Sequence, residues 1–268
     1  MVNSALLLHD AFTFLASDVY CKTPSVIDAN QASVVKTMTS HIHCQNCSMA
    51  TLCLPYQLSP EQTEKLDTVI QRHRPLQKRD LLINSGEPLN YLYAVRSGSL
   101  KSYTLDSQGG EQIIDFHLPG DLIGFDGLID GQHRSYTQAL ETTMLCEIPI
   151  QSLDQLSAEL PGLRKQLLRV MSGELFASKT LLGTLNHHTA QQRLANFLVT
   201  LSSRFQQRGL SSREFRLSMT RADIGNYLGL SVETISRILT QLQNDGVVAV
   251  QNKLIAITAP ERLRALAG

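Results

Sequence analysis

Three cysteines stand close together near the beginning of the chain, with the spacing Cys-x2-Cys-x5-Cys. They are Cys44, Cys47 and Cys53. The two-residue gap lets two thiolates face one centre, and a loop of this length can wrap around that centre. A fourth cysteine, Cys146, lies far along the chain in an apolar segment that ends a predicted strand. The pattern predicts a metal centre held by four thiolates, which ties the loop to a rigid strand.

Structural zinc and an iron–sulfur cluster both suit four thiolates. Zinc sites usually pair two Cys-x2–4-Cys knuckles, and a second knuckle is missing here, so the spacing favours the cluster. His41 and His43 are alternative ligands, although histidines beside a metal loop more often support the ligands. Cys21 is interpreted as a spare thiol. A buried Cys146 that binds no metal is the simpler alternative.

A second signature lies near the end of the chain, where Thr220 and Asp223 form a predicted capping box that begins a short helix. Gly229 ends this helix, because glycine adopts the left-handed conformation without strain. Ser231 then caps a second helix, from Val232 to about Asn244. Two short helices joined by a glycine turn form a helix-turn-helix, whose second helix enters the major groove of DNA.

The outward positions at the start of this second helix are suited to base edges. Arg237 can donate two hydrogen bonds to guanine, Glu233 can accept from base amino groups, and Ser236 can do either. Alternatively, Glu233 is a charge that favours the helix start, or it pairs with Arg237 one turn later. The predicted DNA-contacting residues are Thr220, Arg221, Ser231, Val232, Glu233, Ser236 and Arg237.

The chain after this helix predicts a β-hairpin, with strands at Val247–Val250 and Leu254–Ile257, and so a winged helix. Arg216 and Lys253 are further candidates for phosphate contacts. From Asn186 onward the chain has ten Lys and Arg against five Asp and Glu, although its overall formal charge is zero. This asymmetry suits a tail that meets phosphate, while chance clustering on solvated faces would give the same counts.

The middle of the chain changes from predicted strands to one long helix. From about Leu81 to Pro149, short apolar alternations broken by glycine predict an all-β barrel or roll. From about Leu160 to Leu185, apolar residues recur at three- and four-residue steps. One small roll cannot cover so long a stripe, so we predict a homodimer; packing wholly within one chain is the alternative. The predicted dimerisation residues are Leu167, Met171, Leu175 and Leu182.

Composition excludes several classes of protein. The chain has 268 residues, enough for two domains, and its 43% apolar content is ordinary for a globular protein. It has no stretch of 18 apolar residues and no basic residue before Lys22, which argues against a membrane span and a secretory signal. We therefore predict a cytoplasmic protein with reduced thiols. No catalytic triad, phosphate loop or paired-carboxylate motif stands out, so an enzyme is not predicted.

Together these motifs resemble the FNR branch of the CRP/FNR superfamily of transcription regulators. The resemblance extends from about His43 to Gly268 and is strongest in the blocks HCQNCSMATLCLP, YAVRSGSLKSYTL, FHLPGDLIGFD, QALETTMLCEIP and MTRADIGNYLGLSVETISRIL. It implies an α+β protein with an N-terminal cyclic-nucleotide-binding-like β-roll, a long dimerisation helix and a C-terminal winged helix-turn-helix. The expected segments are a poorly ordered extension at 1–40, a cysteine-rich segment at 41–58, the roll at 59–157, the dimerisation helix at 158–188 and the winged helix at 189–268.

The resemblance also implies a function. The four cysteines of the predicted centre would ligate a 4Fe–4S cluster, which oxygen degrades to a 2Fe–2S form, so that the dimer loosens and DNA affinity falls. Glu233, Ser236 and Arg237 match the readers of a TTGAT half-site, and a two-fold dimer would repeat that half-site as a palindrome. Such a regulator controls the switch between aerobic and anaerobic growth.

RNA polymerase is a further implied partner. Its expected contacts are Thr142, Met144, Phe205, Arg208, Ser211 and Phe215. The loop from Ser107 to Gly110 lacks an acidic residue expected for activation. The stretch from Leu175 to Leu182 also lacks an aspartate that discourages pairing of relatives without a cluster, so we expect readier dimerisation of the apo form.

A cyclic nucleotide is the alternative effector. In the cAMP-binding branch, a Gly-Glu-Leu element and a later Arg-Ser pair hold the ribose and the phosphate. Here the first element is Gly124-Phe125-Asp126, without the glutamate, whereas Arg134-Ser135 is retained. A zinc-stapled transcription regulator of the same fold is the other alternative, which iron and sulfide analysis would distinguish.

Overall fold

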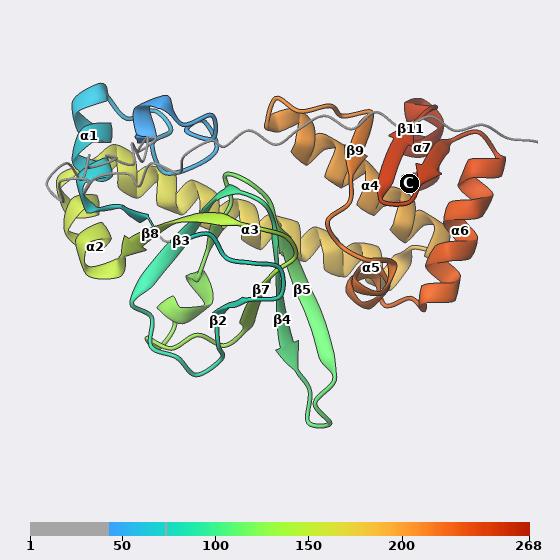
Figure 1. Ribbon diagram of the computed structural model, residues 1–268, viewed down its shortest axis with the longest axis horizontal. Coiled ribbons are helices and arrows are strands. Elements are labelled where there is room, and N and C mark those ends of the chain that lie inside the picture. The colour runs from blue at the N-terminus through green and yellow to red at the C-terminus, as the bar shows by residue number, and fades with distance from the viewer. Residues whose placement is uncertain (1–42, 73) are drawn as a thin grey trace, which may run out of the picture. The chain divides into compact units, whose positions relative to one another are not determined.

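A computed structural model describes residues 43–72 and 74–268 (Figure 1). The predicted extension at 1–40, Cys21 and His41 therefore lie outside the described residues. None of the described helices is long and apolar enough to span a lipid bilayer.

The cysteine segment is short and irregular, and it leads into helix α1. A single 3-10 turn covers Cys44–Asn46, and α1 covers Pro60–Val69. Ser59 accepts a hydrogen bond from the amide of Gln62, whose side chain binds back to the amide of Ser59. Proline at the first helical position needs no amide partner, so this end of α1 is satisfied locally.

The β-roll consists, in the described part of the chain, of two four-stranded antiparallel sheets. One has the strand order β1-β8-β3-β6 and the other β2-β7-β4-β5. The strands are β1 Gln71–Arg72, β2 Leu81–Ile83, β3 Tyr91–Ser97, β4 Leu100–Leu105, β5 Glu111–His117, β6 Leu122–Ile123, β7 Tyr136–Ala139 and β8 Met144–Pro149. A 3-10 turn at Phe125–Leu128 follows β6. The predicted all-β roll is therefore confirmed.

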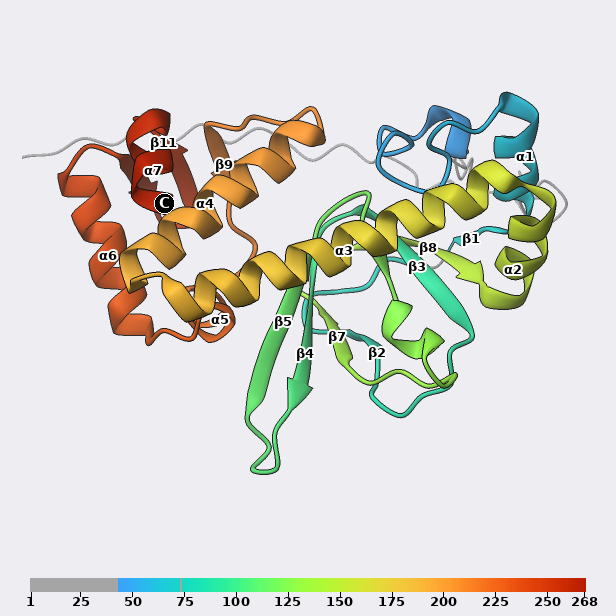
Figure 2. The same ribbon diagram turned by 180° about the vertical axis from the view of Figure 1, so that it is seen from behind.

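Two helices follow the roll, where the sequence pattern predicted one. Helix α2 covers Ile150–Glu159, Leu160 breaks the helical backbone, and α3 continues over Pro161–His187. α3 runs as one unbroken helix (Figure 2). Its first turns pack Leu163 fully into the core of the roll, with Leu167 and Val170 partly buried against the same core. The predicted long helix is confirmed, with the first helix as an addition.

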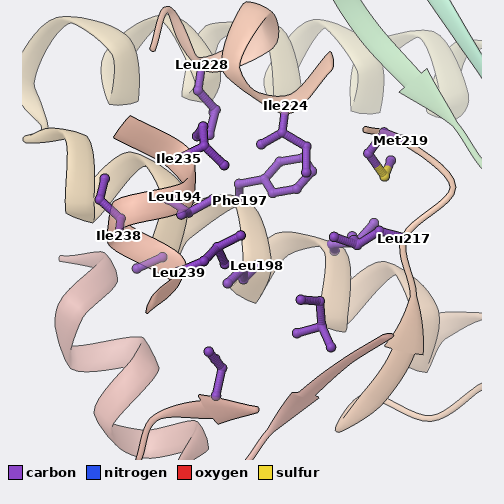
Figure 3. Close-up of a cluster of buried hydrophobic side chains, with 14 of the residues drawn as sticks. Leu194, Phe197, Leu198, Leu217, Met219, Ile224, Leu228, Ile235, Ile238 and Leu239 are labelled. Carbon is purple, nitrogen blue, oxygen red and sulfur yellow. The ribbon is translucent and has the colours of Figure 1, made fainter. Parts of the chain in front are cut away.

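The C-terminal part is a winged helix. Its helices are α4 Ala190–Gln207, α5 Arg221–Leu228, α6 Val232–Asn244 and α7 Pro260–Ala267, and its strands are β9 Glu214–Arg216, β10 Val248–Gln251 and β11 Leu254–Ile257. The strands form a sheet in the order β10-β11-β9. Figure 3 shows the core, in which Leu194 and Leu198 of α4 meet Ile224 of α5 and Ile235 of α6. The predicted helix-turn-helix and hairpin are confirmed, while α7 was not predicted.

Hydrogen bonds and ion pairs join the roll to the winged helix. Asp121, just before β6, binds Arg204 of α4 at 2.5 Å and Arg208 at 2.6 Å. Lys101 of β4 binds Asp223 at the start of α5 at 3.4 Å. The amide of Ile113 on β5 donates to the Asn226 side chain of α5 at 2.7 Å.

Candidate metal centre and nucleic-acid interface

The fold brings the cysteine segment to the strand that holds the fourth cysteine. Cys44, Cys53 and Cys146 all pack against one hydrophobic cluster of the roll, in which Cys44 is itself a buried member. Cys146 lies on β8, opposite Arg72 of β1. The thiols of Cys44, Cys47, Cys53 and Cys146 are free. The sequence predicted this convergence, including the strand position of Cys146.

Burial is the main influence on the thiols of Cys44, Cys53 and Cys146. It raises the pKa of Cys53 to about 12, against a smaller lowering by the amide of Leu54 and a further rise from Cys146 and Cys47. Burial likewise raises the pKa of Cys44, helped by Asp67, and that of Cys146. The cysteines are thus close enough to affect one another's charge, and as thiolates they would repel strongly.

The donor set fits a thiolate-bound centre. Among the described residues, no three His, Cys, Asp or Glu side chains already stand at metal-binding spacing. A metal centre would be held by these sulfurs as thiolates, so its binding would displace their protons. His43, an alternative ligand by sequence, instead turns its Nδ1 to Asp67 at 2.5 Å. Four soft sulfur donors suit an iron–sulfur cluster and zinc alike.

Asp67 of α1 anchors the start of the cysteine segment, and sequence reasoning missed it. Its carboxylate accepts a hydrogen bond from the amide of Cys44 at 3.0 Å and another from Arg72 at 2.5 Å. Burial raises the pKa of Asp67, but hydrogen bonds from His43, Cys44 and Arg72 outweigh burial and lower it to about 2. The carboxylate is therefore ionised at neutral pH and holds the first cysteine against the helix.

The middle of the cysteine segment rests on a glycine turn of the roll. A Cβ atom added to Gly120, where φ is +94°, would stand 3.0 Å from Cβ of Leu52 and 3.7 Å from Cβ of Met49. Met49 and Leu54 are buried. A larger residue in place of Gly120 would lift the segment away from the roll, in addition to straining the backbone.

The nucleic-acid interface is built on local capping. The side chain of Thr220 accepts from the Asp223 amide, Gly229 has a left-handed φ of 63°, and the side chain of Ser231 accepts from the Thr234 amide. A Cβ atom on Gly225 would stand 2.6 Å from the carbonyl oxygen of Leu230, so only glycine lets this turn close. These contacts fix α6 against α5 as the sequence predicted.

The predicted reading residues lie at the start of α6 and are accessible. Val232, Glu233 and Arg237 are exposed, and Ser236 is half-buried. Arg221 donates a hydrogen bond to the hydroxyl of Ser236 at 3.2 Å. Within the described residues no ion pair joins Glu233 to Arg237, but hydrogen bonds from its own amide and from Ser231 lower the pKa of Glu233, as expected of a charge that favours the helix start.

The neighbouring cap and wing supply positions for phosphate. Thr220 and Ser231, at the starts of the two helices, are exposed, as is Arg216. Lys253 of the hairpin donates to the carbonyl oxygen of Ser218 at 2.8 Å. Exposed amide-bearing helix starts beside cations are typical of phosphate contacts.

Helix α3 presents an exposed apolar stripe. Met171, Leu175 and Leu182 are 37%, 58% and 59% exposed. Leu167, also predicted at the dimer interface, is partly buried against its own roll, one turn from Leu163, and its role at the interface stays a prediction. One stripe residue, Leu168, was missed and is 59% exposed. Phe176 is 73% exposed but lies about 100° from Leu175 around the helix, outside the stripe.

Two of the expected polymerase contacts are interior. Phe215 is 5% exposed and stacks on Phe205 with ring centroids 5.0 Å apart. Arg208 is 8% exposed and is occupied by Asp121. Neither side chain is accessible in this arrangement. Thr142, Met144 and Ser211 are exposed and Phe205 is half-buried, so these four residues constitute the accessible part of the predicted surface.

The position that could hold a cyclic nucleotide is filled by a carboxylate of the chain itself. Asp126 accepts hydrogen bonds from the hydroxyl and amide of Ser135, at 2.8 and 3.0 Å, and from the amide of Arg134 at 2.9 Å. Arg134 itself pairs with Asp130. A nucleotide phosphate would have to displace these bonds and then face the carboxylate, which weighs against a cyclic nucleotide as effector.

Comparisons with known proteins agree with this architecture. Residues 73–160 match the cyclic nucleotide-binding domain family, and residues 192–266 match the Crp-like helix-turn-helix domain family. Two proteins named fumarate and nitrate reduction regulatory protein, from Salmonella typhimurium strain LT2 and Escherichia coli strain K12, are each 52% identical to the chain over 227 residues. The aligned region is 85% of this chain and 91% of each relative.

Solved structures of similar fold agree with this family assignment. FixK2 from Bradyrhizobium japonicum is 32% identical with a TM-score of 0.68, over 75% of this chain and 98% of that one. A CooA mutant from Carboxydothermus hydrogenoformans, 19% identical with a TM-score of 0.62 over 79% of this chain and 92% of that one, shares the fold. The family match also confirms that the protein is a DNA-binding regulator and not an enzyme. The chain belongs to the Crp/FNR family of transcription regulators, in the branch of the fumarate and nitrate reduction regulatory proteins.

Proposed function

We propose that this protein is an oxygen-responsive regulator whose affinity for DNA depends on an iron–sulfur cluster held by Cys44, Cys47, Cys53 and Cys146. The observation that supports this most directly is the convergence of the cysteine segment with Cys146 of β8 on one hydrophobic cluster. The names of the relatives, which refer to fumarate and nitrate reduction, support a role in anaerobic metabolism. A cytoplasmic setting, in which thiols stay reduced, is part of the proposal.

The chain's own residues divide the work. When bound, a 4Fe–4S cluster would supply the oxygen-reactive centre. Asp67 and Gly120 hold the cysteine segment against α1 and the roll, so that the four sulfurs can converge. The exposed stripe of α3 would pair with a second copy, because apolar area of this extent is unfavourable in water.

The dimer would place two copies of α6 on one face of the DNA. Glu233, Ser236 and Arg237 would read the two halves of a palindromic TTGAT-type site, one turn apart. RNA polymerase would then meet the surface that includes Thr142 and Met144.

The test is to purify the full chain without air and measure iron, sulfide, zinc and the visible spectrum before and after exposure to oxygen. We expect about four irons and four sulfides per chain, with broad absorbance near about 400 nm that changes in air. Cys146→Ala should lose the iron, whereas Cys21→Ala, which removes a thiol elsewhere, should keep it. A colourless protein with one zinc, or a Cys146→Ala variant with full iron content, would contradict the proposal.

A further inference from the structure

One face of α3 contacts the cysteine segment at three positions, each one helical turn from the next. The side-chain amide of Gln166 donates to the carbonyl oxygen of Cys53 at 2.9 Å, and Gln166 is only 3% exposed. The guanidinium of Arg169 lies 4.1 Å from the ring centroid of Tyr56. Its Nε also donates to the side-chain carbonyl of Gln166 at 2.7 Å. Figures 1 and 2 show the segment, in blue, beside the first turns of α3.

The third contact is made at Gly162, in the first turn of α3. A Cβ atom on Gly162 would stand 3.2 Å from Cδ2 of Leu58. Positions 162, 166 and 169 are spaced four and three residues apart, so they form one row along the helix. The row contacts Cys53, the last cysteine of the segment, and two residues that follow it, Tyr56 and Leu58.

The row lies on the side of α3 opposite to the apolar stripe. At about 100° per residue, positions 162, 166 and 169 fall within about 60° of one another, and Leu168, Met171 and Leu175 lie about 200° around the helix. Leu163 and Leu167, which face the core, lie between the two. The cysteine segment therefore has no direct path to the stripe, and any influence on it passes through the position of α3 as a whole.

We propose that Gln166, supported by Arg169 and Tyr56, is the positioning residue that sets α3 according to the state of the cysteine segment. The inference rests on the proposed function, because it assumes that a cluster fixes Cys53. A ligated Cys53 holds its carbonyl in place, and a buried glutamine amide without its acceptor is costly, so α3 must follow that carbonyl. When the cluster is lost and Cys53 is no longer held, α3 loses this restraint. The apolar stripes of the two copies then pack less well against each other.

The experiment measures coupling between cluster and dimer. The dimer dissociation constant of the full chain is determined anaerobically by sedimentation equilibrium, with the cluster bound and after its removal by chelation. The constant measured without the cluster, divided by the constant measured with the cluster, gives a ratio that reports how strongly the cluster stabilises the dimer. A role limited to general stability would weaken both states alike and leave the ratio unchanged.

Gln166→Ala should keep its iron and sulfide but lower this ratio by about fivefold, which corresponds to about 1 kcal/mol for one buried hydrogen bond. Lys165→Ala, an exposed change on the same turn, should match the wild type. Tyr56→Leu should lower the ratio as well, because it removes the ring under Arg169. Tyr56→Phe, which keeps the ring, should restore the wild-type ratio.

The outcomes separate the inference from the function it rests on. A wild-type ratio of one contradicts the proposed function itself. A wild-type ratio well above one, with the same ratio in Gln166→Ala and Tyr56→Leu, overturns the inference and leaves the function standing. Loss of iron in Gln166→Ala also overturns it, because the residue would then be needed to hold the centre. If Gln166→Ala does not fold, the less buried Tyr56→Leu and Tyr56→Phe decide the question.

Discussion

Asp121 provides the counter-charge for two arginines of the winged helix, and its replacement by asparagine tests how firmly the roll and winged helix are joined. Its two carboxylate oxygens bind Arg204 at 2.5 Å and Arg208 at 2.6 Å. The side chain of Arg208 is 3% exposed, so its charge has no access to water once the pair is broken. An asparagine side chain has nearly the same shape as the carboxylate, and the change therefore removes charge and leaves packing intact.

Breaking a buried ion pair by neutralising one partner costs about 3–5 kcal/mol. We expect a smaller loss for Asp121→Asn, about 2–3 kcal/mol, for two reasons. The carboxylate is 25% exposed, and Arg208 keeps hydrogen bonds to the carbonyl oxygens of Pro119 and Arg204, both at 2.7 Å. The loss should appear as a lower urea midpoint of the apo protein at pH 7, followed by far-ultraviolet circular dichroism.

The roll offers a matched control. Asp130 binds Arg134 at 2.6 Å, a similar distance, but both side chains are about half exposed. An exposed pair contributes about 0.5 kcal/mol or less, so Asp130→Asn should leave the urea midpoint almost unchanged. If Asp121→Asn lost no more stability than Asp130→Asn, burial of Arg208 would not make the loss of its counter-charge costly, and the reasoning would be refuted.

Three further predictions concern DNA, the dimer and pH. Arg237→Ala should weaken binding to the palindromic site by about 1–3 kcal/mol but leave non-specific binding nearly unchanged in fluorescence titrations. An equal loss in Arg264→Ala, a change on α7 outside the predicted DNA-contacting residues, would argue against base readout. Ser178→Asp, within the apolar stripe, should weaken the dimer tenfold or more, about 1.4 kcal/mol, because two like charges would meet; an unchanged sedimentation profile would place the interface elsewhere. Burial and the nearby Asp115 raise the pKa of Glu174 from 4.5 to about 8, so its ionised form disfavours the fold. Stability should therefore fall as pH rises from 4.5 towards 8, and Glu174→Gln should unfold at a higher temperature than the wild type at pH 8.5 but not at pH 4; equal pH profiles would contradict this.

The parts of the fold that could be predicted from sequence are those with local causes. The start and end of α5 depend on Thr220 and Gly229, each of which acts within four residues of its own position. Ser231 sets the start of α6 in the same way, and the structure places α6 over the predicted Val232–Asn244. Capping and left-handed termini are intrinsic to residue type, so they remain visible without knowledge of tertiary contacts.

The parts that could not be predicted depend on contacts between distant segments. Asp67 lies 23 residues from the amide of Cys44 that it holds, and Gln166 lies 113 residues from the carbonyl of Cys53. Asp126 occupies the donors of Arg134 and Ser135 only because a 3-10 turn brings it there. A polar residue in a sequence gives no sign of the partner that it finds, so these roles required the structure.

The partly buried position of Leu167 shows how one helix can serve two surfaces. α3 must cover the roll on one side and remain apolar on another, and Leu167 and Leu168 are adjacent members of these two sets. A pattern of three- and four-residue steps accepts either leucine, because a wide apolar stripe and two narrow stripes give nearly the same spacing. The polar row of Gln166 and Arg169 resolves the ambiguity, since it marks the face that contacts the cysteine segment. With that face fixed, Leu167 lies at the edge between the two surfaces, about 40° from Leu163 and about 40° from Met171, whereas Leu168 lies beyond Met171, close to Leu175.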